Sequence, residues 1–257
     1  MCLVLVAWRS HPDYPLVVAA NRDEFFARPA APAAFWADAP AVLAGRDLQA
    51  GGTWMGATRG GRFAALTNFR DPAVLRAAAA SRGHLVADFL RGRHSAAAYL
   101  AALAPRAGAY NGFNLLVGDG TDLAWISNAG GVPRLLAPGI YGLCNHLLDT
   151  PWPKVEAAKS ALAAALAALP DDAALFRLLR DDSVHPDDAL PRTGVSLEWE
   201  RLLSAAFVRA PGYGTRSSTL LRIGKDDWAV FDEQTWLAGG APGPRVRQRY
   251  SVMSTGV

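Results

Sequence analysis

Residues 2–8 read CLVLVAW and residues 16–24 read LVVAANRDE, and the turn-forming stretch Asp-Tyr-Pro at 13–15 lies between them. Both stretches contain unbroken apolar runs, which are typical of strands buried on both faces. An antiparallel return of the second strand would bring the polar residues 21–24 close to the start of the first strand. The sequence therefore predicts a buried hairpin in which Arg22 and the neighbouring carboxylates lie beside Cys2.

The rest of the chain contains further strand patterns with helical blocks between them. Strands are predicted at 51–58, 62–68, 113–118, 123–126, 140–145, 216–223 and 228–231, and helices at about 82–103, 152–169, 173–180 and 198–206. Many apolar strands with amphipathic helices between them favour stacked sheets covered by helices, which is an α+β layering. At 257 residues, without a repeat or a low-complexity linker, one domain spanning 1–257 is the expectation.

Composition excludes several classes of function. The net charge is only +3, and basic and aromatic residues are not clustered as in a nucleic-acid groove. Arg245, Arg247 and Arg249 alternate, which favours the exposed face of an edge strand. The first apolar run is too short for a membrane span or a secretory signal, so we expect a cytoplasmic protein. Lys is scarce relative to Arg, which we interpret as base-composition bias in a GC-rich bacterial genome.

Cysteine and histidine usage argues against a metal centre. Only Cys2 and Cys144 are present, so neither a disulfide scaffold nor a cysteine zinc site is available. The five histidines contain no helical pair at i, i+4, and we expect no metal. If Asn145 faces a site, strand alternation turns Cys144 and His146 away from it, so a dyad of Cys2 and His146 is disfavoured.

Cys2 carries the chemistry that the pattern suggests. Removal of Met1 would leave one residue with both a thiol, whose reference pKa is ~8.5, and an α-amine, whose reference pKa is ~7.7–8.0. The amine can act as general base for the thiol, so the residue is a complete nucleophile and base pair. The alternative, an inert thiol at this position by accident, stays open.

Several motifs together resemble one family. The chain is similar to the NRDE family, also called the transport and Golgi organisation family. The matching segments are residues 1–8, NRDE at 21–24, GGTWMG at 51–56, LTNFR at 66–70, GFNLL at 112–116, 145–154 with PWPK at 151–154, and YGTRSS at 213–218. The resemblance implies a four-layer αββα sandwich like that of N-terminal-nucleophile hydrolases, and similarity to the penicillin acylase and bile-salt hydrolase group. Members of the family are also associated with haem and lipid handling.

The resemblance assigns roles at the amino terminus. It implies that Cys2 is the nucleophile and that its amine is the base, with Arg22 and Asp23 as the counterparts of the Arg and Asp that contact the nucleophile in the hydrolases. These two residues are adjacent here, and strict alternation would send their side chains to opposite faces. Either the strand bends, or only one of them faces Cys2, together with Asn21 or Glu24. A nearby Arg22 is expected to lower the thiol pKa.

Three more catalytic roles follow from the same resemblance. Asn68 and Asn145 resemble the two asparagines that surround the tetrahedral intermediate, where an amide N–H can stabilise the oxyanion. Arg216 resembles the arginine that supports the nucleophile electrostatically. Ser217 and Ser218 are expected to be supporting hydrogen-bond partners, because the chain has no Gly-x-Ser-x-Gly elbow.

The predicted function is hydrolysis of a non-peptide amide through a Cys2 thioester, with no cofactor required. The alternative is a protein that binds or transfers haem or an acyl lipid on the same scaffold, without turnover. A catalytically inactive interaction scaffold is the third hypothesis. Four aromatic side chains are expected to line the pocket in the first two cases: Trp54, Phe69, Phe113 and Trp152. No Cys-x-x-Cys-His haem-attachment motif is present. The sequence leaves the substrate and the oligomeric state open.

Overall fold

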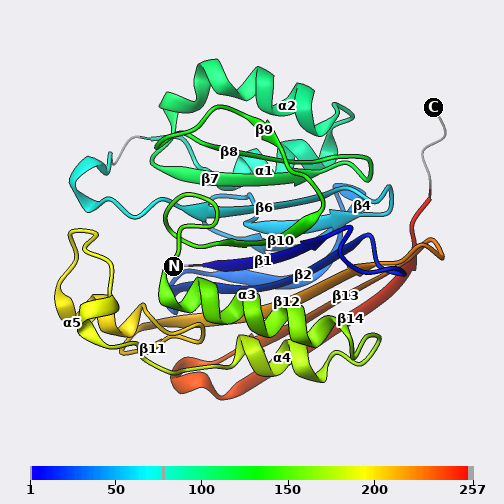
Figure 1. Cartoon of the computed structure of the whole chain (residues 1–257). Coiled ribbons are helices and arrows are strands. Elements are labelled where there is room, and N and C mark those ends of the chain that lie inside the picture. Colours follow the sequence, from blue (N-terminus) through cyan, green and yellow to red (C-terminus); the bar gives the residue numbers. More distant parts are fainter. Residues whose placement is uncertain (1, 77–78, 254–257) are drawn as a thin grey trace.

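The computed structural model describes residues 2–76 and 79–253, which form two stacked antiparallel β-sheets (Figure 1). The first sheet has the order β10 (Gly139–Leu143), β1 (Leu3–Trp8), β2 (Leu16–Phe25), β12 (Tyr213–Ile223), β13 (Trp228–Trp236) and β14 (Pro242–Ser251), and β11 (Arg209–Ala210) pairs with β12. The second has the order β3 (Ala30–Trp36), β4 (Ala39–Asp47), β5 (Met55–Thr58), β6 (Phe63–Asn68), β7 (Phe113–Gly118), β8 (Leu123–Ser127) and β9 (Arg134–Leu135).

Helices cover the outer faces of the two sheets. The helices α1 (Gly83–Arg91) and α2 (Ala96–Leu103) lie on the second sheet, and α3 (Pro153–Leu166) and α4 (Ala173–Leu179) lie on the first (Figure 1). The remaining helical segments are α5 (Leu197–Leu202) and the 3₁₀ turns η1 (Pro72–Val74), η2 (Ala104–Ala109), η3 (Asp187–Ala189) and η4 (Ala238–Gly240). The layers therefore follow the order α, β, β, α, and the predicted α+β sandwich of four layers is confirmed.

Among the described residues, three large apolar cores hold the layers together, and a smaller cluster forms around Leu203, Val208 and Tyr213. The central core joins the sheets and contains Val4 and Val18 from the first and Leu116 from the second. The two outer cores lie under the helix pairs, and Leu3 and Leu5 belong to the one beneath α3 and α4. Alternate residues of β1 thus enter different cores, as predicted for a strand buried on both faces.

Strand β14 is an edge of the first sheet, as the alternating arginines predicted. The strands β3 and β4 were missed because residues 30–47 are rich in Ala and Pro and have no apolar alternation. The predicted helix over 82–103 divides into α1 and α2, since Gly92 is extended and the Ser95 side chain accepts a hydrogen bond from the Ala98 N–H. None of the helices in the described part of the chain is long and apolar enough to cross a membrane.

The pairing of β2 brings the functional ends of three strands together. Leu3 pairs with Asn21, so continuing this register places Cys2 opposite Arg22. On its other side β2 pairs with β12, where Arg22 lies opposite Ser217 and Asp23 opposite Thr215. The extra residue between these pairs is Arg216, which forms a β-bulge. The start of β1, the end of β2 and the bulge of β12 therefore meet at one end of the first sheet.

The fold predicts a large loss of stability when β1 loses an outward-facing side chain. Leu5 is fully buried, and Leu5→Ala should lower the free energy of unfolding by ~2–5 kcal/mol, because a cavity opens under α3. Leu48→Ala makes the same chemical change at a side chain that is 61% exposed, and it should have almost no effect. Urea unfolding of the two variants measures the difference, and equal losses would contradict this assignment of layers.

Candidate active site

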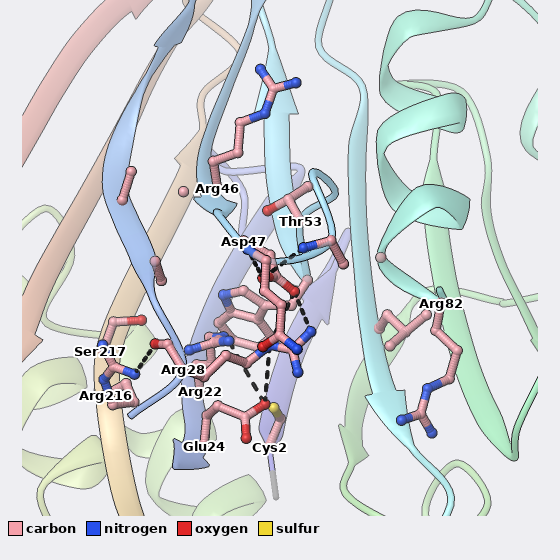
Figure 2. Close-up of a pocket in the computed structure, with 18 of the residues that line it drawn as sticks. Cys2, Arg22, Glu24, Arg28, Arg46, Asp47, Thr53, Arg82, Arg216 and Ser217 are labelled. Atoms are coloured by element: carbon pink, nitrogen blue, oxygen red, sulfur yellow. Dashed lines mark hydrogen bonds and ion pairs between the residues drawn. The ribbon is translucent and has the colours of Figure 1, made fainter. Parts of the chain in front are cut away.

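A cleft of about 530 Å³ opens where the two sheets meet beside Cys2. Six of the predicted site residues line it: Cys2, Arg22, Asp23, Trp54, Asn68 and Arg216. Figure 2 shows the cluster that includes Cys2, Arg22, Arg28 and Glu24, all of which line the cleft. The first sheet supplies Cys2 and Arg22, and the second sheet supplies Asn68. The cleft is within the size range of small-molecule sites.

The side chains of residues 21–24 alternate along β2. Asn21 is fully buried in the outer layer, where its amide nitrogen donates to Leu179 O at 2.7 Å and Ala206 O at 2.8 Å. Arg22 and Glu24 face the cleft and form an ion pair at 3.8 Å. Asp23 accepts a hydrogen bond from the Thr215 hydroxyl at 2.7 Å, and its backbone N–H donates to the Cys2 sulfur. The side chains of Arg22 and Glu24 therefore line the cleft together with Cys2, whereas Asp23 contacts the Cys2 sulfur through its backbone N–H.

The protein environment raises the pKa of the Cys2 thiol. Burial is the largest cause because it disfavours the charged thiolate, and the nearby Asp23 carboxylate raises the pKa further. Arg22 acts in the predicted direction and lowers this pKa, but it does not outweigh burial. The predicted direction of the Arg22 effect is confirmed, but the net shift of the thiol pKa is upward, so the thiol needs a base to become a nucleophile at neutral pH.

Burial also raises the pKa of the Asp23 carboxyl group, while Lys154 and the Thr215 hydroxyl lower it. Lys154 is itself buried and donates to Leu203 O at 2.6 Å. The PWPK motif contains Lys154, but nothing in it indicated proximity to Asp23, because Lys154 stands at the start of a helix more than a hundred residues away. The fold thus brings the ammonium group near enough to lower the pKa of this carboxyl group.

Asn68 and Asn145 come together, with different surroundings. Asn68 ends β6 and is exposed to the cleft. Asn145 follows β10 and is fully buried, and continuing the register of β10 with β1 places it opposite Cys2. Its amide nitrogen donates to Asn68 O at 2.9 Å, and its amide oxygen accepts from the Cys144 thiol at 3.2 Å. Asn145 thus holds the backbone of Asn68 in place, while Asn68 borders the open space.

Arg216 lines the cleft, but its guanidinium is engaged by the main chain. It donates to Phe25 O at 2.9 Å and to Arg28 O at 2.8 Å, which secures the loop after β2 (Figure 2). Ser217 also lines the cleft, whereas Ser218 donates to the Asn21 amide oxygen at 2.6 Å in the outer layer. The bulge turns Arg216 toward the loop, so the geometry gives it a supporting position.

Only one of the four predicted aromatic side chains lines the cleft, namely Trp54. Phe113 is fully buried in the core beneath α1 and α2. Phe69 packs against His146, with ring centres 4.9 Å apart, and Trp152 lies on the other side of His146 at 5.9 Å. The prediction that Phe69, Phe113 and Trp152 line the pocket is therefore corrected, because Phe113 fills a core while the half-buried Phe69 and Trp152 pack around His146 outside the cleft.

Cys144 and His146 have structural surroundings of their own. Cys144 is buried in the core beneath α3, as expected for a small apolar residue. One ring nitrogen of His146 lies 2.8 Å from the Thr150 hydroxyl, and burial lowers the pKa of His146. Neither residue lines the cleft that contains Cys2. Within residues 2–76 and 79–253, no group of three or more His, Cys, Asp or Glu is placed to hold a metal ion.

Sequence reasoning missed much of the charge in the cleft, including Arg28, Arg46, Asp47, Arg82 and Glu233. Arg82 directly precedes α1, and a close backbone contact positions this helix start. A Cβ atom on Gly52 would lie only 2.5 Å from the carbonyl carbon of Gly83, so the loop can approach α1 because residue 52 has no side chain. With Arg so abundant in the chain, no local pattern distinguished these arginines from surface residues.

Comparison with solved structures finds similarity to two hydrolases at low identity. An N-acylethanolamine-hydrolyzing acid amidase ortholog from Caenorhabditis elegans has a TM-score of 0.46 and 11% identity, and the match covers 86% of this chain and 92% of that one. A mutant conjugated bile acid hydrolase from Clostridium perfringens has a TM-score of 0.44 and 12% identity, with 99% and 98% covered.

Comparison with known sequences finds relatives in animals. The transport and Golgi organization protein 2 homolog of Bos taurus is 38% identical, and the match covers 92% of this chain and 94% of the bovine protein. The human homolog is 36% identical with the same coverage, and the Drosophila melanogaster protein is 30% identical over 91% of this chain and 92% of its own. These eukaryotic relatives do not support the predicted bacterial source. Residues 1–238 match the model of the family described as transport and Golgi organisation 2, and the chain belongs to this family, as the motifs predicted.

Proposed function

We propose that this protein is a cysteine-dependent amidohydrolase that cleaves a non-peptide amide through a thioester on Cys2. The main support is the position of Cys2, which borders an open cleft with Arg22 opposite and the Asp23 N–H on its sulfur. A thiol in such a position can reach a bound carbonyl carbon, and an adjacent cation stabilises its thiolate. The other described cysteine, Cys144, is buried away from the cleft.

The raised pKa of the thiol makes a general base necessary, and the proposed base is the α-amine of Cys2 after removal of Met1. Met1 lies outside the described residues. The Asp23 carboxylate lies close enough to raise the pKa of the thiol, so it can also stabilise the protonated form of an amine on Cys2. The same residue would then supply nucleophile and base, as in other enzymes with an amino-terminal nucleophile.

The proposed reaction has two stages. The amine takes the thiol proton, the sulfur attacks the carbonyl carbon, and the amide C–N bond breaks as the ammonium returns the proton to the leaving nitrogen. Water then attacks the thioester, which releases the acid and restores the thiol. Asn68 borders the cleft and is the proposed donor to the oxyanion. Arg22 stabilises the thiolate, whereas Asn145 and Arg216 hold Asn68 and the loop after β2.

The alternative proposal is a protein that carries haem or an acyl lipid. We also propose a cytoplasmic location. The cleft lining includes five arginines, namely Arg22, Arg28, Arg46, Arg82 and Arg216, together with the acids Asp23, Glu24, Asp47 and Glu233. A long apolar ligand requires mostly apolar walls, because charged groups lose hydration when such a ligand covers them. The charged lining therefore favours a small polar substrate and supports the hydrolase proposal over the carrier.

Hydrolysis should depend on Cys2 and not on Cys144. Purified protein should lack Met1 in its intact mass, and Cys2→Ala should abolish hydrolysis across a panel of N-acyl amides, because the thioester cannot form. Cys144→Ala removes the other thiol from a position outside the cleft and should retain activity. If wild-type protein cleaves no amide while Cys2→Ala binds haem or an acyl lipid normally, the carrier proposal replaces this one.

The pH dependence of alkylation should reveal the competing effects on Cys2. Thiolate is the reactive form, so a raised pKa moves the midpoint of the rate profile above the ordinary thiol range. Arg22→Gln removes a cation that lowers this pKa, so the midpoint should move higher still and the rate at pH 7 should fall by roughly 3–10-fold. The exposed Arg93→Gln makes the same change outside the cleft and serves as control. An unchanged midpoint in Arg22→Gln would argue against contact between the guanidinium and the thiolate.

A further inference from the structure

The arginines of the cleft differ in what neutralises them. Three of them form ion pairs with carboxylates: Arg28 with Asp47 at 2.6 Å, Arg46 with Asp38 at 2.6 Å, and Arg22 with Glu24 at 3.8 Å. Arg216 is held by two backbone carbonyls of the loop after β2. Most of the positive charge in the cleft is therefore already matched by groups of the protein itself.

Among the described residues, Arg82 also has no carboxylate partner, and it has one backbone acceptor where Arg216 has two. One of its terminal nitrogens donates to Gly112 O at 2.9 Å, and within the described part of the chain no carboxylate forms an ion pair with it. Burial lowers its pKa, and the negative charges of Cys2 and Glu24 act in the opposite direction. A guanidinium stays protonated even so, because its reference pKa lies above ~12. The protein thus holds a partly desolvated cation in the cleft without a full counter-charge.

Arg82 and the paired charges lie on different sides of the cleft. Arg82 lines the same cleft as Arg22 and Glu24, and Figure 2 shows it across from them, with a strand ribbon between. On the other wall, Arg22 and Arg28 are already paired with the carboxylates of Glu24 and Asp47. A negatively charged group that enters the cleft is therefore directed toward Arg82, while the neutral part of the same ligand can approach Cys2.

We infer that Arg82 binds a single carboxylate on the ligand, so that the cleft selects amides that carry one negative charge. A guanidinium presents parallel N–H groups that match the two oxygens of a carboxylate. In the described part of the chain Arg216 also lacks a carboxylate partner, but two backbone carbonyls accept from it, whereas a single carbonyl accepts from Arg82. The amide part of this inference rests on the proposed function, and the carboxylate part rests on the charges of the cleft alone.

Two alkylating reagents of similar shape test the carboxylate part at Cys2. Iodoacetate carries one negative charge and iodoacetamide carries none, so the ratio of their alkylation rates at Cys2 reports the local electrostatic potential. Both reagents react with the same thiolate, so a change in the fraction of thiolate does not alter this ratio. Arg82→Gln should lower this ratio by about fivefold, because it removes the unpaired cation. Arg82→Lys should keep the ratio near the wild-type value, and so should the surface control Arg93→Gln. An Arg82→Gln ratio equal to that of wild type overturns the inference.

A binding measurement tests the site without relying on thiol reactivity. Calorimetry of the Cys2→Ser variant with hexanoylglycine and hexanoylglycinamide compares a carboxylate with its neutral counterpart. The carboxylate should bind about tenfold more tightly, and adding Arg82→Gln should remove the difference. Equal affinities, including no binding of either compound, overturn the inference. Selective binding of hexanoylglycine without hydrolysis of any amide by wild-type protein would overturn the proposed function and retain the carboxylate site. Hydrolysis of amides without any preference for a carboxylate would retain the proposed function and overturn the carboxylate site.

Discussion

The register between β1 and β2 is the constraint on which the site depends. A slip of one residue would turn Cys2 away from the cleft and into the layer beneath α3. Both faces of β1 are apolar, so its side chains fit the observed register and the slipped register almost equally well. The polar residues at the end of β2 must therefore select the observed register. Asn21 satisfies carbonyl groups of the outer layer, and Arg22 meets Glu24 in the cleft. Exchanging these two environments would leave an amide and a guanidinium buried without partners.

The cleft is also where the two sheets are fastened together by polar contacts. The Asn145 amide, next to the first sheet, donates to the backbone of Asn68 in the second. Glu233 on β13 accepts a hydrogen bond from the backbone N–H of Ala33 on β3 at 2.8 Å. A purely apolar interface between sheets could slide by small steps, whereas directional hydrogen bonds fix its alignment. These contacts hold residues from the two sheets at constant positions around one space.

Burial has opposing consequences for the chemistry of this space. It raises the pKa of the Cys2 thiol and of the Asp23 and Glu233 carboxyl groups, and it lowers the pKa of Arg82. Each shift favours the neutral form, because the surrounding protein solvates charge poorly. The same low polarisability strengthens every attraction between a charge of the protein and a charge of a ligand.

Local patterns were enough to predict the hairpin of β1 and β2, the meeting of Cys2 with Arg22, the edge strand β14 and, through its motifs, the family and the layered fold. Apolar periodicity and turn residues act over a few positions, so one chain segment reveals them. Only the tertiary structure separated Phe113, which fills a core, from Trp54, which borders the cleft, because an aromatic residue suits either place. It also brought Arg82 to the same cleft as Arg22. Contacts between residues so distant in sequence depend on how whole layers stack, and no short stretch of sequence encodes that arrangement.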